Sequence, residues 1–409
     1  MYIKYKHQHF KEYFNLSSYL LLFFLLKSFS LVSQLDVVVG AERTEFYLGN
    51  LMNQRVGLVA NQTSKIKNEH LVDVLLNEGV NVIKVFSPEH GFRGKSDAGE
   101  KVKDEIDLQT GLPIYSLYGK TKRKPSKEIL KDIDIVIFDL QDVGVRFYTY
   151  ISSLHYVMEA CAENNVKLLV LDRPNPNGFY VDGPILDLKF RSFVGMHPIP
   201  VVHGMTIGEY AQMINGEKWL NNQIICSLKV IPCLNYNHKT RYNLPIPPSP
   251  NLPNMRSIYL YPSLCFFEGT NVSVGRGTDY PFQIFGAPYF TETEFSFIPK
   301  STYGAKNPKH KLVTCFGSDL RTMPIDSLRK INKLNLNWLV NSYKSSNESE
   351  DFFNKNNFFN LLAGSDKLMN LVKGGANALH MSETYQASLN DFKVVRKKYL
   401  LYEDFEQLN

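Results

Sequence analysis

The segment that decides the fold is VNVIKVF at residues 80–86, which runs directly into SPEHGFRG at residues 87–94. Its apolar part predicts a buried strand, because short apolar runs bounded by turn residues are typical of strands covered on both faces. Three chemically active residues, Glu89, His90 and Arg93, then follow between proline and glycine. Open α/β sheets bind ligands at the carboxyl ends of their parallel strands. The segment therefore predicts a parallel sheet with a site at its edge.

The same alternation of strands and helices continues on both sides of this segment. Strands are expected at Val56–Ala60, Ile135–Phe138, Leu168–Leu171 and, more weakly, Ile199–Val202, and helices at 68–77, at 151–163 and from the cap residue Thr206 to Ile214. Glu209 stands at the capping-box position of the last helix. Such alternation is typical of βαβ units. It predicts a Rossmann-like α/β fold with a mostly parallel sheet and helices on both faces.

The length of 409 residues favours two domains. A proline-rich stretch, NLPIPPSPNLP at residues 243–253, interrupts the alternation and predicts an extended linker or a wall between domains. We expect a Rossmann-like catalytic domain over residues 34–255 and a smaller mixed α/β domain over residues 256–409. The active-site cleft is expected between them.

The N-terminus predicts a signal peptide over residues 1–33. Basic residues precede the apolar run YLLLFFLL at residues 19–26, and small residues follow up to Ser33. The run is short for a membrane span, and an uncleaved anchor is the alternative. We expect a periplasmic or secreted protein with no stable membrane insertion after cleavage.

Composition argues against several classes of ligand. The net charge of +6 is spread along the chain, and the basic stretch Lys120–Lys127 favours a solvated surface over a nucleic-acid site. The first strand is not followed by G-x-G-x-x-G, and no phosphate-binding G-x-x-x-x-G-K-[ST] loop occurs, so no nucleotide cofactor is expected. The five cysteines give no complete disulfide framework, and pairing of Cys226 with Cys233 stays open.

Polar segments follow four of the expected strands and would meet at one edge of the sheet. Besides SPEHG they are NQTS at 61–64, DLQDVGVRFYTY at 139–150 and DRPNPNG at 172–178. A glycine-rich stretch further along, residues 266–283, contains Glu268 and Arg276 and is expected to form a wall of the same cleft. A metal held by His90, Asp142, Asp172 and His203 is conceivable, but no paired-histidine spacing supports it and none is predicted.

Carboxylates among aromatic and amide side chains suit the cleavage of glycosidic bonds. Such enzymes use a carboxylic acid to protonate the leaving oxygen and usually a second carboxylate. Glu89 is the leading candidate for the acid, with an ion pair to Arg93 as its structural alternative. Asp142 and Asp172 are alternative partners, although each also suits a role in orienting an arginine or capping a turn.

These motifs, together with EGTNVSVGRGT at residues 268–278, closely resemble the NamZ-type exo-β-N-acetylmuramidases. The resemblance extends from about Val56 to Tyr402. It implies a bacterial peptidoglycan hexosaminidase that releases N-acetylmuramic acid from the non-reducing ends of glycan fragments. It also implies a Rossmann-like domain, a smaller C-terminal domain and a cleft between them.

On this resemblance Glu89 is the expected catalytic carboxylate, and Glu268 is a cleft residue that joins the catalytic set. The second catalytic group stays open between Glu268, Asp142, Asp172 and the acetamido group of the substrate. The expected substrate-binding residues are Asn61, His90, Asp142, Arg146, Tyr148, Asp172, Arg173, Asn175, Asn177 and Arg276.

The substrate adds one hypothesis, because N-acetylmuramic acid carries a lactyl carboxylate. A guanidinium binds a carboxylate in a bidentate manner, so Arg146, Arg173 or Arg276 is expected to bind this group. Two other classes of function remain open: a metal-dependent amidase or esterase of the cell wall, and a non-catalytic sugar-binding protein. The first would depend on a metal, and the second would not need Glu89.

Overall fold

The computed structural model describes residues 35–406 apart from residues 90, 94–103, 120–122 and 291–292. The expected signal peptide at 1–33 and the candidate His90 lie outside the described residues. Val38–Asn409 forms one compact unit. None of the helices in the described part of the chain is long and apolar enough to cross a membrane.

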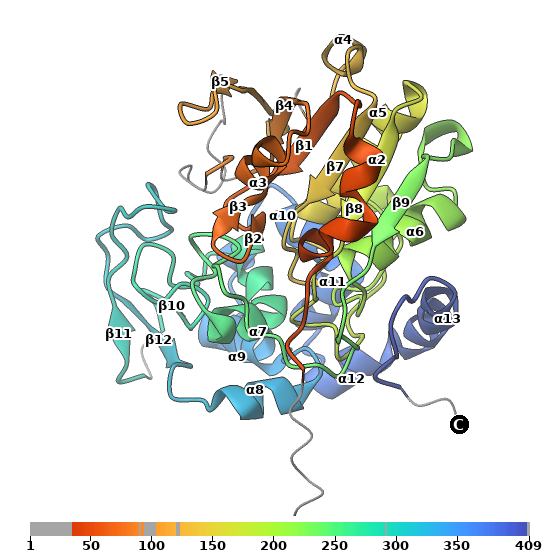
Figure 1. Cartoon of the computed structure of the whole chain (residues 1–409). Coiled ribbons are helices and arrows are strands. Elements are labelled where there is room, and N and C mark those ends of the chain that lie inside the picture. The colour runs from red at the N-terminus through yellow and green to blue at the C-terminus, as the bar shows by residue number, and fades with distance from the viewer. Residues whose placement is uncertain (1–34, 90, 94–103, 120–122, 291–292, 407–409) are drawn as a thin grey trace, which may run out of the picture. The chain divides into compact units, whose positions relative to one another are not determined.

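A seven-stranded sheet forms the centre of this unit (Figure 1). Its strands, in spatial order, are β5 (Glu105–Ile106), β6 (Pro113–Ser116), β4 (Val82–Ser87), β1 (Val56–Ala60), β7 (Ile135–Asp139), β8 (Lys167–Leu171) and β9 (Leu228–Ile231). All neighbouring pairs are parallel except β5 with β6. Val59 of β1 lies in register with Phe86 of β4 and Phe138 of β7. The predicted mostly parallel sheet is confirmed.

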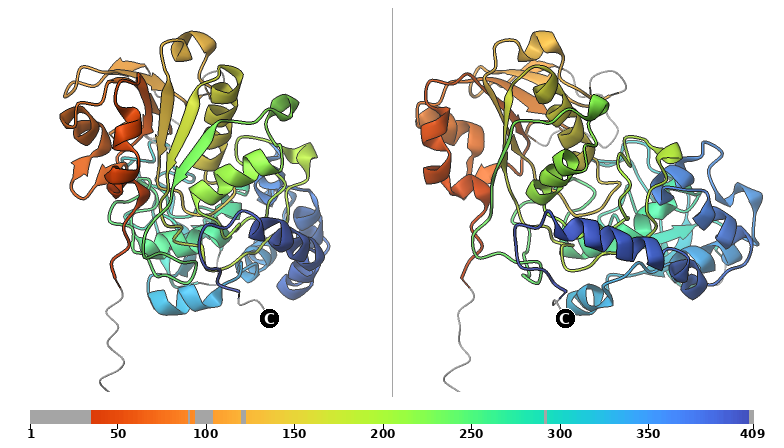
Figure 2. Two further views of the ribbon diagram at one scale, coloured as in Figure 1. Left: turned by 45° about the vertical axis from the view of Figure 1, so that its right-hand side comes forward. Right: turned by 90° about the vertical axis from the view of Figure 1, so that its right-hand side faces the viewer.

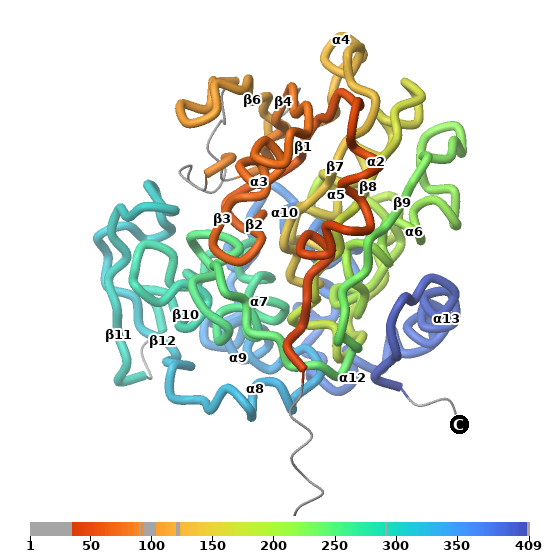
Figure 3. The backbone as a smooth tube through the Cα atoms, viewed as in Figure 1, coloured from red at the N-terminus to blue at the C-terminus, as the bar shows by residue number. Residues whose placement is uncertain are grey.

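The order of the strands creates a reversal at β1. The chain first adds β4 and β6 on one side of β1, then crosses to add β7, β8 and β9 on the other side, as Figure 3 shows. In open α/β sheets such a reversal leaves a crevice at the carboxyl ends of the strands. The loops that follow β4, β6 and β7 therefore start at this edge.

Both faces of the sheet are covered, because alternate side chains of each strand point to opposite faces. In β1, Leu58 packs with α3 (Leu71–Asn77) in one hydrophobic cluster, whereas Val59 packs with α5 (Tyr150–Glu163) in another. This burial on two faces explains why the strands are continuous apolar runs.

Most of the expected helices are present. Thr206 caps α6 (Ile207–Gly216) and forms the predicted capping box with Glu209. The helix expected from residue 68 begins at Leu71, because Glu69–His70 is strand β3, which pairs with β2 (Lys65–Ile66).

The prediction of a weak strand at Ile199–Val202 is wrong. Pro200 lacks the N–H that a sheet ladder needs, and Val202 forms only isolated bridges, with Val145 and Asp182.

The C-terminal region combines a small sheet with helices. It begins with α7 (Met255–Leu264) and η6 (Cys265–Gly269), and its antiparallel strands have the order β10 (Ile284–Ala287), β12 (Cys315–Asp319), β11 (Ser296–Phe297). The helices are α8 (Ile325–Ile331), α9 (Asn337–Ser345), α10 (Phe358–Ala363), α11 (Lys367–Lys373), α12 (Ala378–Glu383) and α13 (Gln386–Lys397). The remaining elements are η2 (Gly40–Glu42), η3 (Thr44–Phe46), α2 (Leu48–Leu51), α4 (Lys127–Leu130), η4 (Leu188–Phe190), η5 (Asn221–Gln223) and η7 (Glu350–Phe352).

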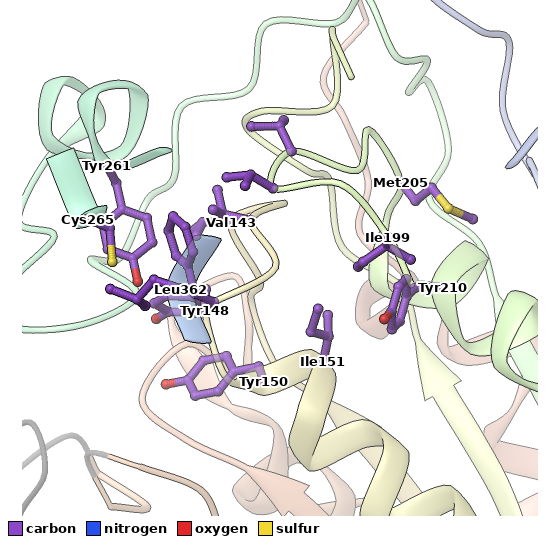
Figure 4. Close-up of a cluster of buried hydrophobic side chains, with 14 of the residues drawn as sticks. Val143, Tyr148, Tyr150, Ile151, Ile199, Met205, Tyr210, Tyr261, Cys265 and Leu362 are labelled. Carbon is purple, nitrogen blue, oxygen red and sulfur yellow. The ribbon is translucent and has the colours of Figure 1, made fainter. Parts of the chain in front are cut away.

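The C-terminal region packs closely on the sheet region. Figure 4 shows Tyr148 and Tyr150 beside Tyr261, Cys265 and Leu362, which come from α7, η6 and α10. In both views of Figure 2, α13 lies close to α6, and the hydroxyl of Tyr399 donates to Glu217 just beyond α6, at 2.6 Å. One hydrophobic cluster thus extends across residue 255, and the boundaries of the two expected domains stay predictions.

Candidate active site

A cavity of about 1100 Å³ opens at the carboxyl edge of the sheet. Its wall on the sheet side comes from the loops after β4, β6 and β7, which contribute Glu89, Tyr118 and Thr149. Its other wall comes from the C-terminal region, including Glu268 and Arg276. The cavity therefore joins the two regions in the way that the sequence predicted for the cleft.

Glu89 is held at the rim of this cavity by a turn. The N–H of Gly91 donates to the carbonyl of Pro88 at 3.2 Å, and Gly91 adopts φ +78°, a left-handed conformation that favours glycine. The hydroxyl of Thr149 donates to Glu89 Oε2 at 3.2 Å. The alternative pairing of Glu89 with Arg93 is not formed, since Arg93 binds Asp107 at 2.7 and 2.9 Å. Glu89 lines the cavity.

Tyr118 is a neighbour of Glu89 that the sequence analysis missed. Burial and the hydrogen-bonded Glu89 carboxylate raise the pKa of the Tyr118 phenol. The phenol therefore stays protonated, and its O–H donates a hydrogen bond to the Glu89 carboxylate. Among the described residues, hydroxyls from the loop after β6 and from the loop after β7 both donate hydrogen bonds to Glu89.

Glu268 and Arg276 form an ion pair on the opposite wall. Arg276 Nε donates to Glu268 Oε1 at 2.9 Å, and 26% of each side chain is exposed. Burial opposes ionisation of Glu268, but the charges of Arg276 and Lys309 outweigh it and lower the pKa of the carboxyl. Glu268 therefore presents an ionised carboxylate to the cavity.

Lys309 fixes the segment that carries Glu268, and the sequence analysis did not single it out. Its ammonium donates to the carbonyls of Phe267 and Val272 at 3.0 Å each and also to that of Thr270. Burial lowers the pKa of Lys309 to about 8. Behind this segment, a Cβ on Gly269 would lie 2.4 Å from the Cα of Phe359, so only glycine permits the packing of η6 on α10. The ammonium and this close contact together hold Glu268 in place.

A second, smaller space of about 60 Å³ adjoins Glu89. It is lined by Tyr148, Tyr150 and Arg276 among others. The hydroxyl of Tyr148 donates to the carbonyl of Pro248 at 2.9 Å, so the proline-rich stretch packs on the loop after β7. Asn61 does not line either space; its amide donates to the hydroxyl of Tyr150 at 2.7 Å and supports that ring.

Several predicted substrate-binding residues lie inside the protein instead of on the cavity. Asp172 accepts from the hydroxyl of Thr206 at 2.7 Å and the N–H of Gly208 at 2.8 Å, at the start of α6. Asn175 donates to the carbonyl of Met205 at 2.8 Å, and Asn177 to that of Val143 at 2.8 Å. Asp142 accepts from the N–H of Gly144 at 2.6 Å. Their contacts with substrate stay predictions.

Two of the three arginines considered for the lactyl carboxylate are also enclosed. Arg146 is fully buried and donates to the carbonyls of Pro184, Ile199 and Leu362 at 2.7 to 2.8 Å. Arg173 forms a bidentate pair with Asp139 at 2.6 and 2.8 Å. Of the three, only Arg276 lines the cavity.

Of the four residues considered for a metal, His90 lies outside the described residues, and Asp142, Asp172 and His203 do not form a ligand set. His203 Nε2 lies 3.9 Å from Asp142 Oδ2, and Asp172 belongs to the α6 network. Among the described residues, no group of three or more His, Cys, Asp or Glu side chains is arranged to hold a metal ion.

Asp142 makes stability depend on pH. Burial raises the pKa of Asp142 from 3.8 to about 7, so the folded state binds its proton more tightly than the unfolded state does. The contribution of this carboxyl to stability is present below pH ~4 and is lost as pH rises through 7. Burial lowers the pKa of the neighbouring His203 to about 3, which leaves that ring neutral in this range.

We therefore expect Asp142→Asn to change the pH profile of unfolding. Relative to the variant, the wild type should lose up to about 1.4 kcal/mol of unfolding free energy per pH unit between pH 4 and 7. Urea titrations of both proteins at several pH values measure this difference. Profiles that stay parallel would contradict it.

Comparison with known proteins assigns the family. The model of the N-terminal part of the exo-β-N-acetylmuramidase NamZ matches residues 56–256, and the model of its C-terminal part matches residues 259–402. The chain belongs to the NamZ exo-β-N-acetylmuramidase family. The N-terminal NamZ model covers the loop after β4 with Glu89, and the C-terminal NamZ model covers the segment with Glu268. Both segments line the cavity.

Individual relatives agree with this assignment. The peptidoglycan β-N-acetylmuramidase NamZ of Bacillus subtilis is 39% identical over 376 residues, which cover 87% of this chain and 89% of the relative. Two crystal structures of DUF1343 family proteins from Bacteroides fragilis share the fold. One has a TM-score of 0.84 at 49% identity, covering 90% of this chain and 100% of the other, and the second has 0.77 at 30%, covering 90% and 99%.

Proposed function

We propose that this chain is an exo-acting glycoside hydrolase that releases N-acetylmuramic acid from the non-reducing ends of peptidoglycan fragments. The observation that carries the proposal is that the Glu89 and Glu268 side chains line one cavity in a member of the NamZ family. Most glycoside hydrolases use a pair of carboxyl groups that flank the scissile bond as their catalytic groups. The relative from Bacillus subtilis, named as a peptidoglycan β-N-acetylmuramidase, supports the same activity.

In the proposed mechanism Glu89 protonates the glycosidic oxygen as the aglycon leaves. The Tyr118 and Thr149 hydroxyls orient its carboxyl group by hydrogen bonds. A positioned acid of this kind contributes to rate by transferring its proton in the transition state. As the bond breaks, positive charge develops on the sugar ring.

Glu268 is the proposed second carboxylate. Its pairing with Arg276 keeps it ionised, and an anion on the cavity wall stabilises positive charge on the ring. Asp142 and Asp172, the other carboxylates considered, are buried in the network behind the cavity. The substrate's acetamido group remains the alternative partner of Glu89.

The test is hydrolysis of a chromogenic N-acetyl-β-muraminide by the purified protein. We expect turnover with release of N-acetylmuramic acid, and the same rate after exhaustive treatment with a chelator. Loss of turnover on chelation, restored by divalent metal, would show that cleavage of the glycosidic bond depends on a metal. No turnover of this substrate, together with chelator-sensitive cleavage of wall peptide or acyl bonds, would instead favour the metal-dependent amidase or esterase. Binding of the substrate with no turnover would favour the sugar-binding protein.

We also propose that the protein acts in the periplasm or outside the cell, where peptidoglycan fragments are accessible. The support is the basic and apolar pattern of residues 1–33. N-terminal sequencing of the protein from its native host tests this proposal, and a mature chain that still begins at Met1 in the cytoplasm would overturn it.

A further inference from the structure

The loop after β6 brings a second arginine, Arg123, to the cavity beside Arg276. Arg123 lines it together with Ser192 and Phe193. In the sequence, Arg123 belongs to the basic stretch that we interpreted as solvated surface. In the structure its guanidinium lies over the ring of Phe193, with 4.3 Å from Cζ to the ring centroid, and it is partly buried. Stacking of this kind holds a planar cation in place while leaving its edge available.

The other cationic groups of the cavity wall are already engaged. Arg276 pairs with Glu268, and the Lys309 ammonium has three backbone carbonyl acceptors. Lys306 is exposed. For Arg123, within the described part of the chain, the Nε–H is buried and has no hydrogen-bond acceptor.

Ser192 repeats this pattern on the same wall. Its Oγ is also buried without a hydrogen-bond partner among the described residues. Other buried donors also lack a partner, such as Nε of Arg256 and Arg329, but Arg123 and Ser192 both line the cavity, where a ligand acceptor can reach them. A guanidinium and a hydroxyl together suit a carboxylate, which accepts on two oxygens.

We propose that Arg123, assisted by Ser192, binds the lactyl carboxylate of the muramyl ring and so determines specificity for muramic acid over glucosamine. This inference rests on the proposed function, because it names the residue that binds the lactyl group of the proposed substrate. It replaces the earlier hypothesis for Arg146 and Arg173, whose guanidinium groups bind protein carbonyls and Asp139.

The experiment compares two substrates that differ only at the lactyl group, which is an anionic carboxylate in one and a neutral methyl ester in the other. One is a chromogenic N-acetyl-β-muraminide whose lactyl group is a free carboxylate, and the other is the lactyl methyl ester of the same compound. The wild type should hydrolyse the acid with a kcat/KM about 10- to 100-fold above that of the ester, as expected for a charge-assisted pair. Arg123→Gln should abolish this preference by losing activity on the acid, and Arg123→Lys should recover part of it.

Controls separate this effect from general damage. Arg55→Gln makes the same change in net charge at an exposed arginine paired with Asp134, and it should keep the wild-type preference. Thermal melting shows whether each variant is folded. A folded Arg123→Gln that keeps the full preference would overturn the proposal, as would loss of the preference in Arg276→Lys instead. A wild type that hydrolyses neither substrate would overturn the proposed function itself.

Discussion

Glu89→Gln is expected to lower kcat for an N-acetyl-β-muraminide with a poor leaving group by about 10³-fold, because the amide has the size of the carboxyl group but no acidic proton to donate. The loss should be much smaller for a substrate whose leaving group is activated, such as a dinitrophenyl glycoside, since that bond breaks with little protonation. The hydrogen bond from Thr149 can be kept by the amide oxygen, so the fold should not change. Steady-state kinetics on the two substrates measure the difference.

The matched control is Glu403→Gln, which removes an exposed carboxylate, with 73% of its side chain accessible, near Lys239. This variant should behave as the wild type on both substrates. Equal losses on the two substrates for Glu89→Gln would argue against a role as the acid. Unchanged turnover would exclude a catalytic role for Glu89.

Arg173→Leu is expected to lower the free energy of unfolding by about 3 to 5 kcal/mol, because it leaves the buried Asp139 without its partner. The side chains of Arg173 and Asp139 are only 5% and 0% exposed, and the pair joins the end of β7 to the loop after β8. Chemical denaturation measures the change. Any protein that remains folded should keep its KM for the muraminide, because Arg173 lies away from the cavity.

The chain contains a matched exposed pair for comparison. Arg55 also binds an aspartate, Asp134, in a bidentate manner at 2.8 and 3.1 Å, but 47% and 35% of these side chains are exposed. Arg55→Leu should lower the free energy of unfolding far less than Arg173→Leu does, because solvent screens the exposed pair. A stable Arg173→Leu with a strongly raised KM would instead restore Arg173 as a substrate contact.

The sheet, and the presence of Glu89 and Glu268 on one cavity, could be predicted from the sequence for clear physical reasons. Strands covered on both faces must be apolar throughout, and the chain has few such runs, so β1, β4, β7 and β8 were identified. Glu89 and Glu268 stand out because each is a carboxylate set among glycine and aromatic residues, where close backbone packing leaves room for a ligand. The family resemblance through the same motifs is confirmed by the NamZ models.

Other polar residues at the strand ends have structural partners in the folded chain, and their contacts with substrate stay predictions. Backbone groups that leave a strand lose their ladder partners and must find others. Asn175 and Asn177 meet this need by binding the carbonyls of Met205 and Val143, and Asp172 caps α6. Nothing in their residue types separates these roles from binding a sugar.

Arg123 and Lys309 could not be identified as cavity residues from the sequence. Both stand among other basic residues in loops, a pattern that usually marks solvated surface. Their roles depend on contacts with Phe193 and with the carbonyls around Glu268, residues that are far away in sequence. Only the folded chain brings these groups together.

The five cysteines have a practical consequence. All are free and buried, Cys226 and Cys233 included, and burial raises the pKa of Cys226 to about 12 and that of Cys315 to about 11. Thiols that are both inaccessible and protonated react with alkylating reagents only when the surrounding structure opens. Cys161, Cys226 and Cys233 lie in or beside the sheet region, and Cys265 and Cys315 lie in the C-terminal region. Alkylation of these cysteines, followed by mass spectrometry, can therefore show whether the sheet region and the C-terminal region open together or one at a time.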